Sequence, residues 1–88
     1  MECFVIDALY LNGRYALVVR DGDIKLLIEA LYIHAVRKGD ILILSDKSTY
    51  TVNYEEGRSL TVLSATQFSS SQWRILKKLS YFEKVECN

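Results

Sequence analysis

The sequence contains no proline and only one histidine, and it carries no excess charge of either sign. Eleven Lys and Arg residues balance eleven Asp and Glu residues, so the formal net charge is zero. Nucleic-acid binding draws much of its affinity from cations on phosphates, and this balance therefore argues against a dedicated nucleic-acid-binding protein. The single histidine, His34, has no Cys, His or acidic cluster around it at ligand spacing, which argues against a metal site or a general base.

Cysteine is also scarce, since Cys3 and Cys87 lie near opposite ends of the chain and form no Cys-x-x-Cys motif. Zinc-binding spacings are therefore absent. A disulfide would tie the two ends together, but we favour two reduced thiols in a cytosolic protein. The longest apolar runs are too short to span a membrane, and the first residues lack the basic segment of a signal peptide. We therefore expect a cytoplasmic protein that makes no membrane contact.

The 88 residues fit a single domain, 1–88, and its first third has the pattern of an antiparallel meander. Asn12-Gly13 and Asp21-Gly22 are both turn dipeptides that supply positive φ. With these dipeptides at the tips, Leu11 pairs with Arg14 and Ile6 pairs with Val19 in the first hairpin, and Val19 pairs with Ile24 in the second. One face of the meander is then wholly apolar or aromatic: Ile6, Ala8, Tyr10, Tyr15, Leu17, Val19, Ile24, Leu26 and Ile28. The opposite face is mixed, and its scattered Leu9, Ala16, Val18 and Leu27 suggest that another element covers part of it.

A second β unit follows residues 29–40, which fit either a helical turn or a short extended crossing. Residues 41–44 are wholly apolar, which is typical of a strand in the middle of the structure or at a barrel seam. Tyr50, Val52 and Tyr54 alternate with polar residues, and a turn at residues 55–57 would place Val52 opposite Leu60 in the return strand, residues 59–65.

The end of the chain changes to a helical period. Ser69, Ser70 or Ser71 can cap a helix, and Ile75, Leu76, Leu79 and Phe82 then recur at helical spacing with Trp73 beside them. The pattern predicts a helix over residues 71–83 that packs on an open end or on the outer face of the β structure. The predicted fold is thus mainly β: a small SH3-like barrel of about six antiparallel strands over residues 2–65, with a C-terminal α-helix. A two-sheet α+β arrangement is the main alternative.

Residues 6–42 resemble a small uncharacterised bacterial family of compact β proteins. The shared features are Ile6-Asp7, Gly13-Arg14-Tyr15-Ala16, Asp21-Gly22 and Gly39-Asp40-Ile41-Leu42. Members of that family usually carry prolines between the third and fourth strands, and this chain has none. The resemblance implies a compact β fold and no particular activity.

The sequence shows no set of residues typical of catalysis. It also has no phosphate-binding loop, because each of the four glycines is explained by a turn. We therefore predict a non-enzymatic protein-binding module, an adaptor or an inhibitor, that needs no cofactor and whose partner is another protein. Its candidate binding residues are Tyr32 and His34 in the connection, and Trp73, Arg74, Lys77, Lys78 and Tyr81 on the helix.

Two alternatives remain open. A nucleic-acid-binding small barrel could use exposed aromatic side chains and a cationic strip of Arg37 and Lys38 with Arg74, Lys77 and Lys78. However, Tyr10, Tyr15, Tyr50 and Tyr54 all fall on predicted core faces. A homo-oligomeric structural subunit could instead use the apolar strand 41–44 as its contact.

Overall fold

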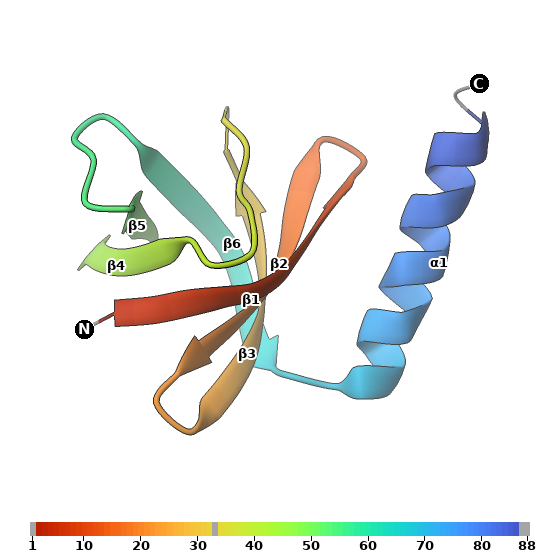
Figure 1. Ribbon diagram of the computed structural model, residues 1–88, viewed down its shortest axis with the longest axis horizontal. Coiled ribbons are helices and arrows are strands. Elements are labelled where there is room, and N and C mark those ends of the chain that lie inside the picture. The colour runs from red at the N-terminus through yellow and green to blue at the C-terminus, as the bar shows by residue number, and fades with distance from the viewer. Residues whose placement is uncertain (1, 33, 87–88) are drawn as a thin grey trace.

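The computed structural model describes residues 2–32 and 34–86, with side chains described as far as Ser80. Six strands form one closed antiparallel barrel in the order β1-β2-β3-β6-β5-β4, and a helix, α1, stands against its outside (Figure 1). The elements are β1 (Glu2–Leu11), β2 (Arg14–Asp21), β3 (Ile24–Leu31), β4 (Ile41–Asp46), β5 (Thr49–Val52), β6 (Ser59–Gln67) and α1 (Ser70–Glu86). The predicted barrel with a C-terminal helix is confirmed, and the two-sheet alternative is excluded. The SH3-like label stays a prediction.

The first hairpin has its tip at Asn12-Gly13, as predicted. Both residues have positive φ, 54° and 77°, which is the type I′ geometry that matches the twist of the flanking strands. Leu11 therefore pairs with Arg14. The next pair, Tyr10 and Tyr15, brings two rings edge to face with centroids 5.0 Å apart.

A β-bulge in β1 overturns the predicted pairing of Ile6 with Val19. The register shifts between Val5 and Asp7, so Val5 pairs with Val19 and Asp7 pairs with Val18. The extra residue reverses the alternation of side chains. Cys3 and Val5 therefore point into the barrel, and Ile6 packs on its outer face.

The second hairpin also differs from the predicted pairing, because its tip is Gly22-Asp23. Asp21 pairs with Ile24, and Val19 pairs with Leu26 rather than with Ile24. Gly22 alone has positive φ at this tip, 62°, which fits a type II′ turn with glycine in its first central position. The shift of two residues keeps every side chain on its predicted face but moves Ile24 to the end of the strand, where it is 59% exposed.

The β3–β4 connection contains no helix or strand among its described residues. It buries Val36 and pairs with β1, because the Val5 amide donates to Asp40 O and the Gly39 amide donates to Val5 O. Strand β4 then closes the barrel between β1 and β5, so the predicted seam is confirmed. Both edges of β4 are paired and Leu42 is fully buried. Strand β4, which the homo-oligomer alternative would use as its contact, therefore has both edges paired within the barrel, and homo-oligomerisation stays a prediction.

The β5–β6 hairpin is longer than predicted. Tyr50, not Val52, pairs with Leu60. Asn53 and Tyr54 have φ of 53° and 60° and make a turn closed by the Glu55 amide on Val52 O. The turn leaves the Tyr54 side chain 61% exposed, outside its predicted core position.

Ten buried residues fill the barrel interior: Cys3, Val5, Leu17, Val19, Ile28, Ala30, Val36, Leu42, Val52 and Leu60. Every strand contributes at least one of them. Tyr15 and Tyr50 pack against this core as predicted, whereas Tyr10 is 54% exposed. None of the ten belongs to α1, so among the residues whose side chains are described the interior is formed by the strands and the β3–β4 connection.

Candidate functional site

A second apolar cluster lies on the outside of the barrel, beneath α1. Val18 and Leu27 are buried there against Trp73, which is 7% exposed. Partly buried neighbours complete this outer cluster: Ile6, Leu9, Ala16, Phe68 and Leu76. The bulge in β1 is what turns Ile6 toward the helix. The expectation that another element covers Leu9, Ala16, Val18 and Leu27 is confirmed, and that element is α1.

The helix begins where the sequence predicts a cap. The Ser69 hydroxyl accepts from the Gln72 amide at 3.3 Å, and the Ser69 carbonyl accepts from the Trp73 amide. This N-cap geometry satisfies amides that the first helical turn leaves without partners. The helix therefore starts one residue earlier than the predicted position 71, and Trp73 is placed in its first turn.

The carboxylate of Asp7 connects β1 to α1. Its Oδ2 accepts from the Trp73 indole Nε1 at 3.3 Å and lies 3.4 Å from Lys77 Nζ, while Oδ1 accepts from the Ala8 amide at 3.0 Å. Lys77 therefore reaches back to the sheet through its charge. An exposed ion pair of this kind contributes about 0.2–1 kcal/mol, so the apolar cluster supplies most of the docking energy.

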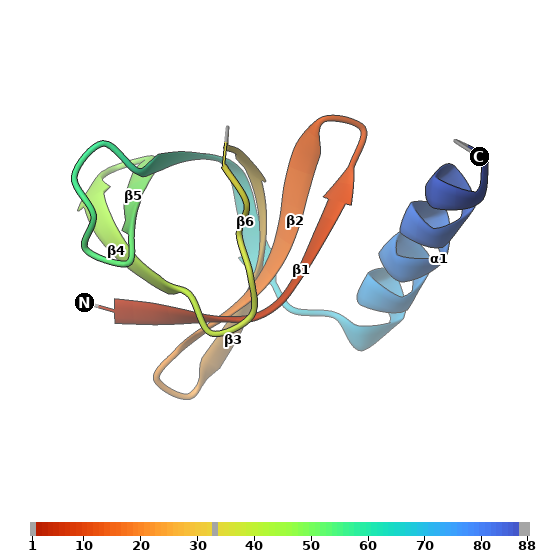
Figure 2. The same cartoon turned by 45° about the horizontal axis from the view of Figure 1, so that its top comes forward.

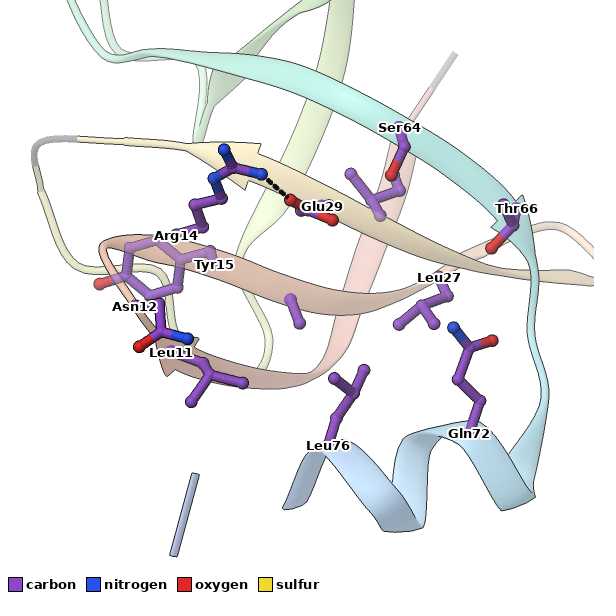
Figure 3. A pocket seen from close by; sticks show the side chains of 12 residues that line it. Leu11, Asn12, Arg14, Tyr15, Leu27, Glu29, Ser64, Thr66, Gln72 and Leu76 are labelled. Carbon is purple, nitrogen blue, oxygen red and sulfur yellow. Dashed lines mark hydrogen bonds and ion pairs between the residues drawn. The ribbon is translucent and has the colours of Figure 1, made fainter. Parts of the chain in front are cut away.

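A groove of about 450 Å³ opens beside this contact, between α1 and the outer faces of β2, β3 and β6 (Figure 3). Its apolar lining includes Leu11, Ala16, Leu27 and Leu76. Its polar lining includes Arg14, Glu29, Ser64, Thr66 and Gln72. This volume is within the range of sites that hold small molecules or a few side chains of a partner, and mixed linings of this kind allow both affinity and orientation.

An ion pair lies on the wall of the groove. Arg14 Nη1 lies 2.5 Å from Glu29 Oε1, and the two side chains are 56% and 42% exposed. Figure 3 shows the pair at the end of the groove away from Gln72. Because both groups remain accessible, each can exchange its present partner for an opposite charge on an incoming molecule.

The helix divides the predicted binding residues between two environments. Arg74 and Lys78 are exposed, next to Ile75 and Leu79, which are 59% and 49% exposed. Of the predicted apolar stripe, Leu76 packs on the barrel together with Trp73, whereas the prediction is wrong for Ile75 and Leu79. The buried Ser80 completes the packed side. While α1 is docked, Trp73 is covered by the sheet. Tyr81, Phe82 and Cys87 lie outside the residues whose side chains are described.

Tyr32 and His34 form a separate cluster in the β3–β4 connection. Their rings meet edge to face at 5.4 Å. The Tyr32 hydroxyl accepts from Arg58 Nε at 2.8 Å, and Arg58 also pairs with Glu55 at 2.7 Å. Figures 1 and 2 show the β1–β2 hairpin between this connection and α1. The predicted cationic strip is therefore not assembled, because Arg37 and Lys38 belong to the connection.

The structure gives no support for a nucleophile at Cys3. Burial, and then the charge of Asp21, raise the pKa of the Cys3 thiol, which keeps it protonated. Burial, then the charge of Cys3 and that of Asp21, raise the pKa of Tyr50, which also shares a hydrogen bond with Cys3. Among the described residues, no group of three His, Cys, Asp or Glu side chains could hold a metal ion. No described helix is long and apolar enough to cross a lipid bilayer.

The groove residues were absent from the sequence prediction. Arg14 and Glu29 are distant in sequence, but they point outward from neighbouring strands at a diagonal, since Ala16 pairs with Glu29. The predicted register, in which Val19 pairs with Ile24, already sets Arg14 directly opposite Glu29, so this opposite-charge pair could have been found from the sequence. Ser64, Thr66 and Gln72 carry no distinguishing sequence signal, because polar residues on an outer face are ordinarily solvated.

Comparison with known proteins identifies relatives of this chain. A model of the IraM/PmrD family matches residues 1–74. The signal transduction protein PmrD of Escherichia coli strain K12 is 33% identical over 64 residues, which make up 70% of this chain and 73% of that protein. The crystal structure of E. coli PmrD superposes with a TM-score of 0.82 at 30% identity, covering 91% of this chain and 99% of that one. The comparisons support a small bacterial barrel family, and the four motifs quoted for the expected resemblance stay untested as features of it.

Proposed function

Because the chain belongs to the IraM/PmrD family, we propose that it is a non-enzymatic protein-binding module of a signalling pathway, acting as an adaptor or an inhibitor. The relative from E. coli is a signal transduction protein. A small neutral barrel can act in such a pathway by occupying a surface of another protein. The partner is then altered by binding alone, and no cofactor takes part.

The groove between α1 and the barrel carries this proposal. It joins an apolar floor to an exposed ion pair, and an exposed helix face with Arg74, Ile75, Lys78 and Leu79 adjoins it. Apolar anchors surrounded by polar side chains are typical of protein interfaces. Catalysis would instead require matched acid, base or nucleophilic groups. The charged groups among the described lining residues are Arg14 and Glu29, which pair with each other, and no described contact joins either to a lining hydroxyl. We therefore assign the groove to binding.

The test is capture of the partner with matched variants on one strand. Thr66→Arg places a long charged side chain in the groove, and Thr61→Arg places the same side chain elsewhere on β6. Both threonines are exposed, so both variants are expected to fold. Tagged chains are used to capture proteins from cells of the source organism, with and without nuclease, at about 50 and 200 mM salt.

We expect wild type and Thr61→Arg to retain the same protein after nuclease treatment and at the higher salt, and Thr66→Arg to lose it. Equal recovery by both variants would contradict the groove as the binding site. Recovery that disappears with nuclease or at 200 mM salt would instead support the nucleic-acid alternative.

A further inference from the structure

The helix is held to the barrel along one narrow face. Trp73 and Leu76 pack on the outer cluster and Lys77 reaches Asp7, whereas Ile75 and Leu79 on the other side are 59% and 49% exposed. The backbone of α1 comes closest to β1, and its side chains reach Val18 of β2 and Leu27 of β3. Figures 1 and 2 show the helix as a separate rod beside the barrel. Among the side chains of α1 described, residues 70–80, few therefore hold the helix to the barrel.

The barrel interior does not depend on this contact. The ten residues of the interior cluster all come from the strands and the β3–β4 connection, and the outer cluster is distinct from them. Departure of α1 would thus leave the interior packing in place. It would uncover an apolar face of Leu9, Ala16, Val18 and Leu27, with the Asp7 carboxylate at its border.

We propose that α1 is a displaceable occupant of this face, and that the face accepts an amphipathic helix from the partner protein in its place. The contacts of α1 define what fits: a large aromatic side chain with an N–H or O–H donor, and a Lys or Arg one turn later. Trp73 and Lys77 show this spacing, since both reach Asp7 Oδ2. The inference rests on the proposed function and extends it: Ala16 and Leu27 line both the groove and this face, so a partner element that enters the groove can go on to replace α1 there.

Energetics allow such an exchange. An isolated helix of the length of α1, 17 residues, is only marginally stable in water. Attachment through the short segment 68–69 gives α1 an effective concentration on the order of millimolar. A partner helix must therefore bind the uncovered face well enough to overcome this local competitor, and weakening α1 should make the face easier to occupy.

The test supplies the helix as a separate molecule. The probe is a fluorescently labelled peptide with the sequence of residues 70–86, added to the full-length chain while fluorescence anisotropy is measured. We expect the Trp73→Ala chain to bind the peptide at least tenfold more tightly than the wild-type chain does, because its own helix no longer covers the face. Lys77→Glu, which opposes Asp7, should act in the same direction, and it provides a second variant should Trp73→Ala fail to fold.

Matched peptides identify the contacts. A peptide with Trp73→Ala should bind the Trp73→Ala chain at least tenfold more weakly than the unmodified peptide, whereas a peptide with Ile75→Ala, on the exposed side, should bind equally well. Absence of binding by both variant chains, with the barrel shown to be folded by dispersed amide resonances, would overturn the proposal. So would equal binding of the wild-type and variant chains.

The oligomeric state is a separate control, for which the mass of the wild-type chain in solution is measured by light scattering. A dimer that exchanges its helices would make a second copy of the chain the occupant of the face. That result would overturn the assignment of the face to a different protein. The peptide assay needs no natural partner. Its failure would therefore leave the proposed function standing, and failure to capture a partner would leave the peptide result intact.

Discussion

Removal of the Trp73 ring should detach α1 while leaving the barrel folded. A buried aromatic side chain removes about 150–250 Å² from water, which at about 25 cal/mol per Å² gives an upper limit of about 4–6 kcal/mol. Correction for a compact unfolded chain lowers this, in agreement with roughly 3–5 kcal/mol for Trp→Ala changes in cores. The exposed Lys77–Asp7 pair that remains contributes about 0.2–1 kcal/mol. The half-buried Leu76 cannot make up the difference.

The loss should be confined to the helix because the interior cluster contains none of the α1 residues 70–80, whose side chains are described. In Trp73→Ala, amide hydrogen exchange should therefore show that the amides of α1 lose about a hundredfold or more of their protection. Amides of β2 and β3 beside Leu17 and Ile28 should keep most of theirs. Ile75→Ala, on the exposed side of the same helix, is the control and should change α1 protection by less than about threefold.

Two results would refute this reasoning. Unchanged protection of α1 in Trp73→Ala would mean that other contacts hold the helix. An equal loss of protection throughout the barrel would mean that helix and barrel unfold as one cooperative unit, and that the two clusters are not energetically separate.

Three further predictions concern the barrel itself. Leu17→Ala, at a fully buried site, should lower the free energy of unfolding by about 2–5 kcal/mol in urea titrations. Leu63→Ala, at a 43% exposed site, should lower it much less. Similar values for the two variants would contradict the assigned interior. Tyr54→Gly should stabilise the chain by about 0.5–1 kcal/mol, because an exposed tyrosine with φ of 60° is strained. A lower urea midpoint of unfolding in this variant would argue against strain at Tyr54. The raised pKa of Cys3 implies a contribution to folding stability that is present below the ordinary thiol pKa of 9.0 and lost as pH rises through the higher pKa of the folded chain. Unfolding followed by fluorescence from pH 8 to pH 10.5 should show this loss of stability. Cys3→Val should make the loss smaller.

The hairpin tips show how far turn chemistry can predict a fold. Asn12-Gly13 was placed correctly because both residues tolerate positive φ. Asp21-Gly22-Asp23 offered two adjacent tips, and the choice between type I′ and type II′ could not be made from the residues alone. Either choice put the same side chains inward, so the core was predicted better than the pairing.

The bulge at Ile6 could not be seen in the sequence. A strand pattern of alternating residues assumes a period of two, and Phe4 and Ile6 fit that assumption as well as Cys3 and Val5 do. The closed interior accommodates the smaller Cys3 and Val5. The bulge then sends Ile6 and Asp7 together to the outer face, which creates the contact with α1.

The packed face of α1 was predicted only in part, for a related reason. The predicted stripe joined Leu76 to Ile75 and Leu79. Because Ile75 with Leu79 and Trp73 with Leu76 both recur at helical spacing, periodicity alone does not choose between the two sides of the helix. Position in the chain decides the choice, because the short segment after β6 brings Trp73 against Val18 and Leu27. The groove depends on this docking and was therefore beyond prediction from the sequence.

The central claim is that the groove beside α1 binds another protein, and site-specific photo-cross-linking tests it most directly. A photoreactive residue is placed at Gln72, which lines the groove, and in a second chain at Lys47, an exposed turn residue between β4 and β5. In cells of the source organism, we predict one protein adduct at Gln72 that resists nuclease and disappears when Thr66→Arg is added. Adducts at Lys47 with none at Gln72, or a nucleic-acid adduct at Gln72, would contradict the claim.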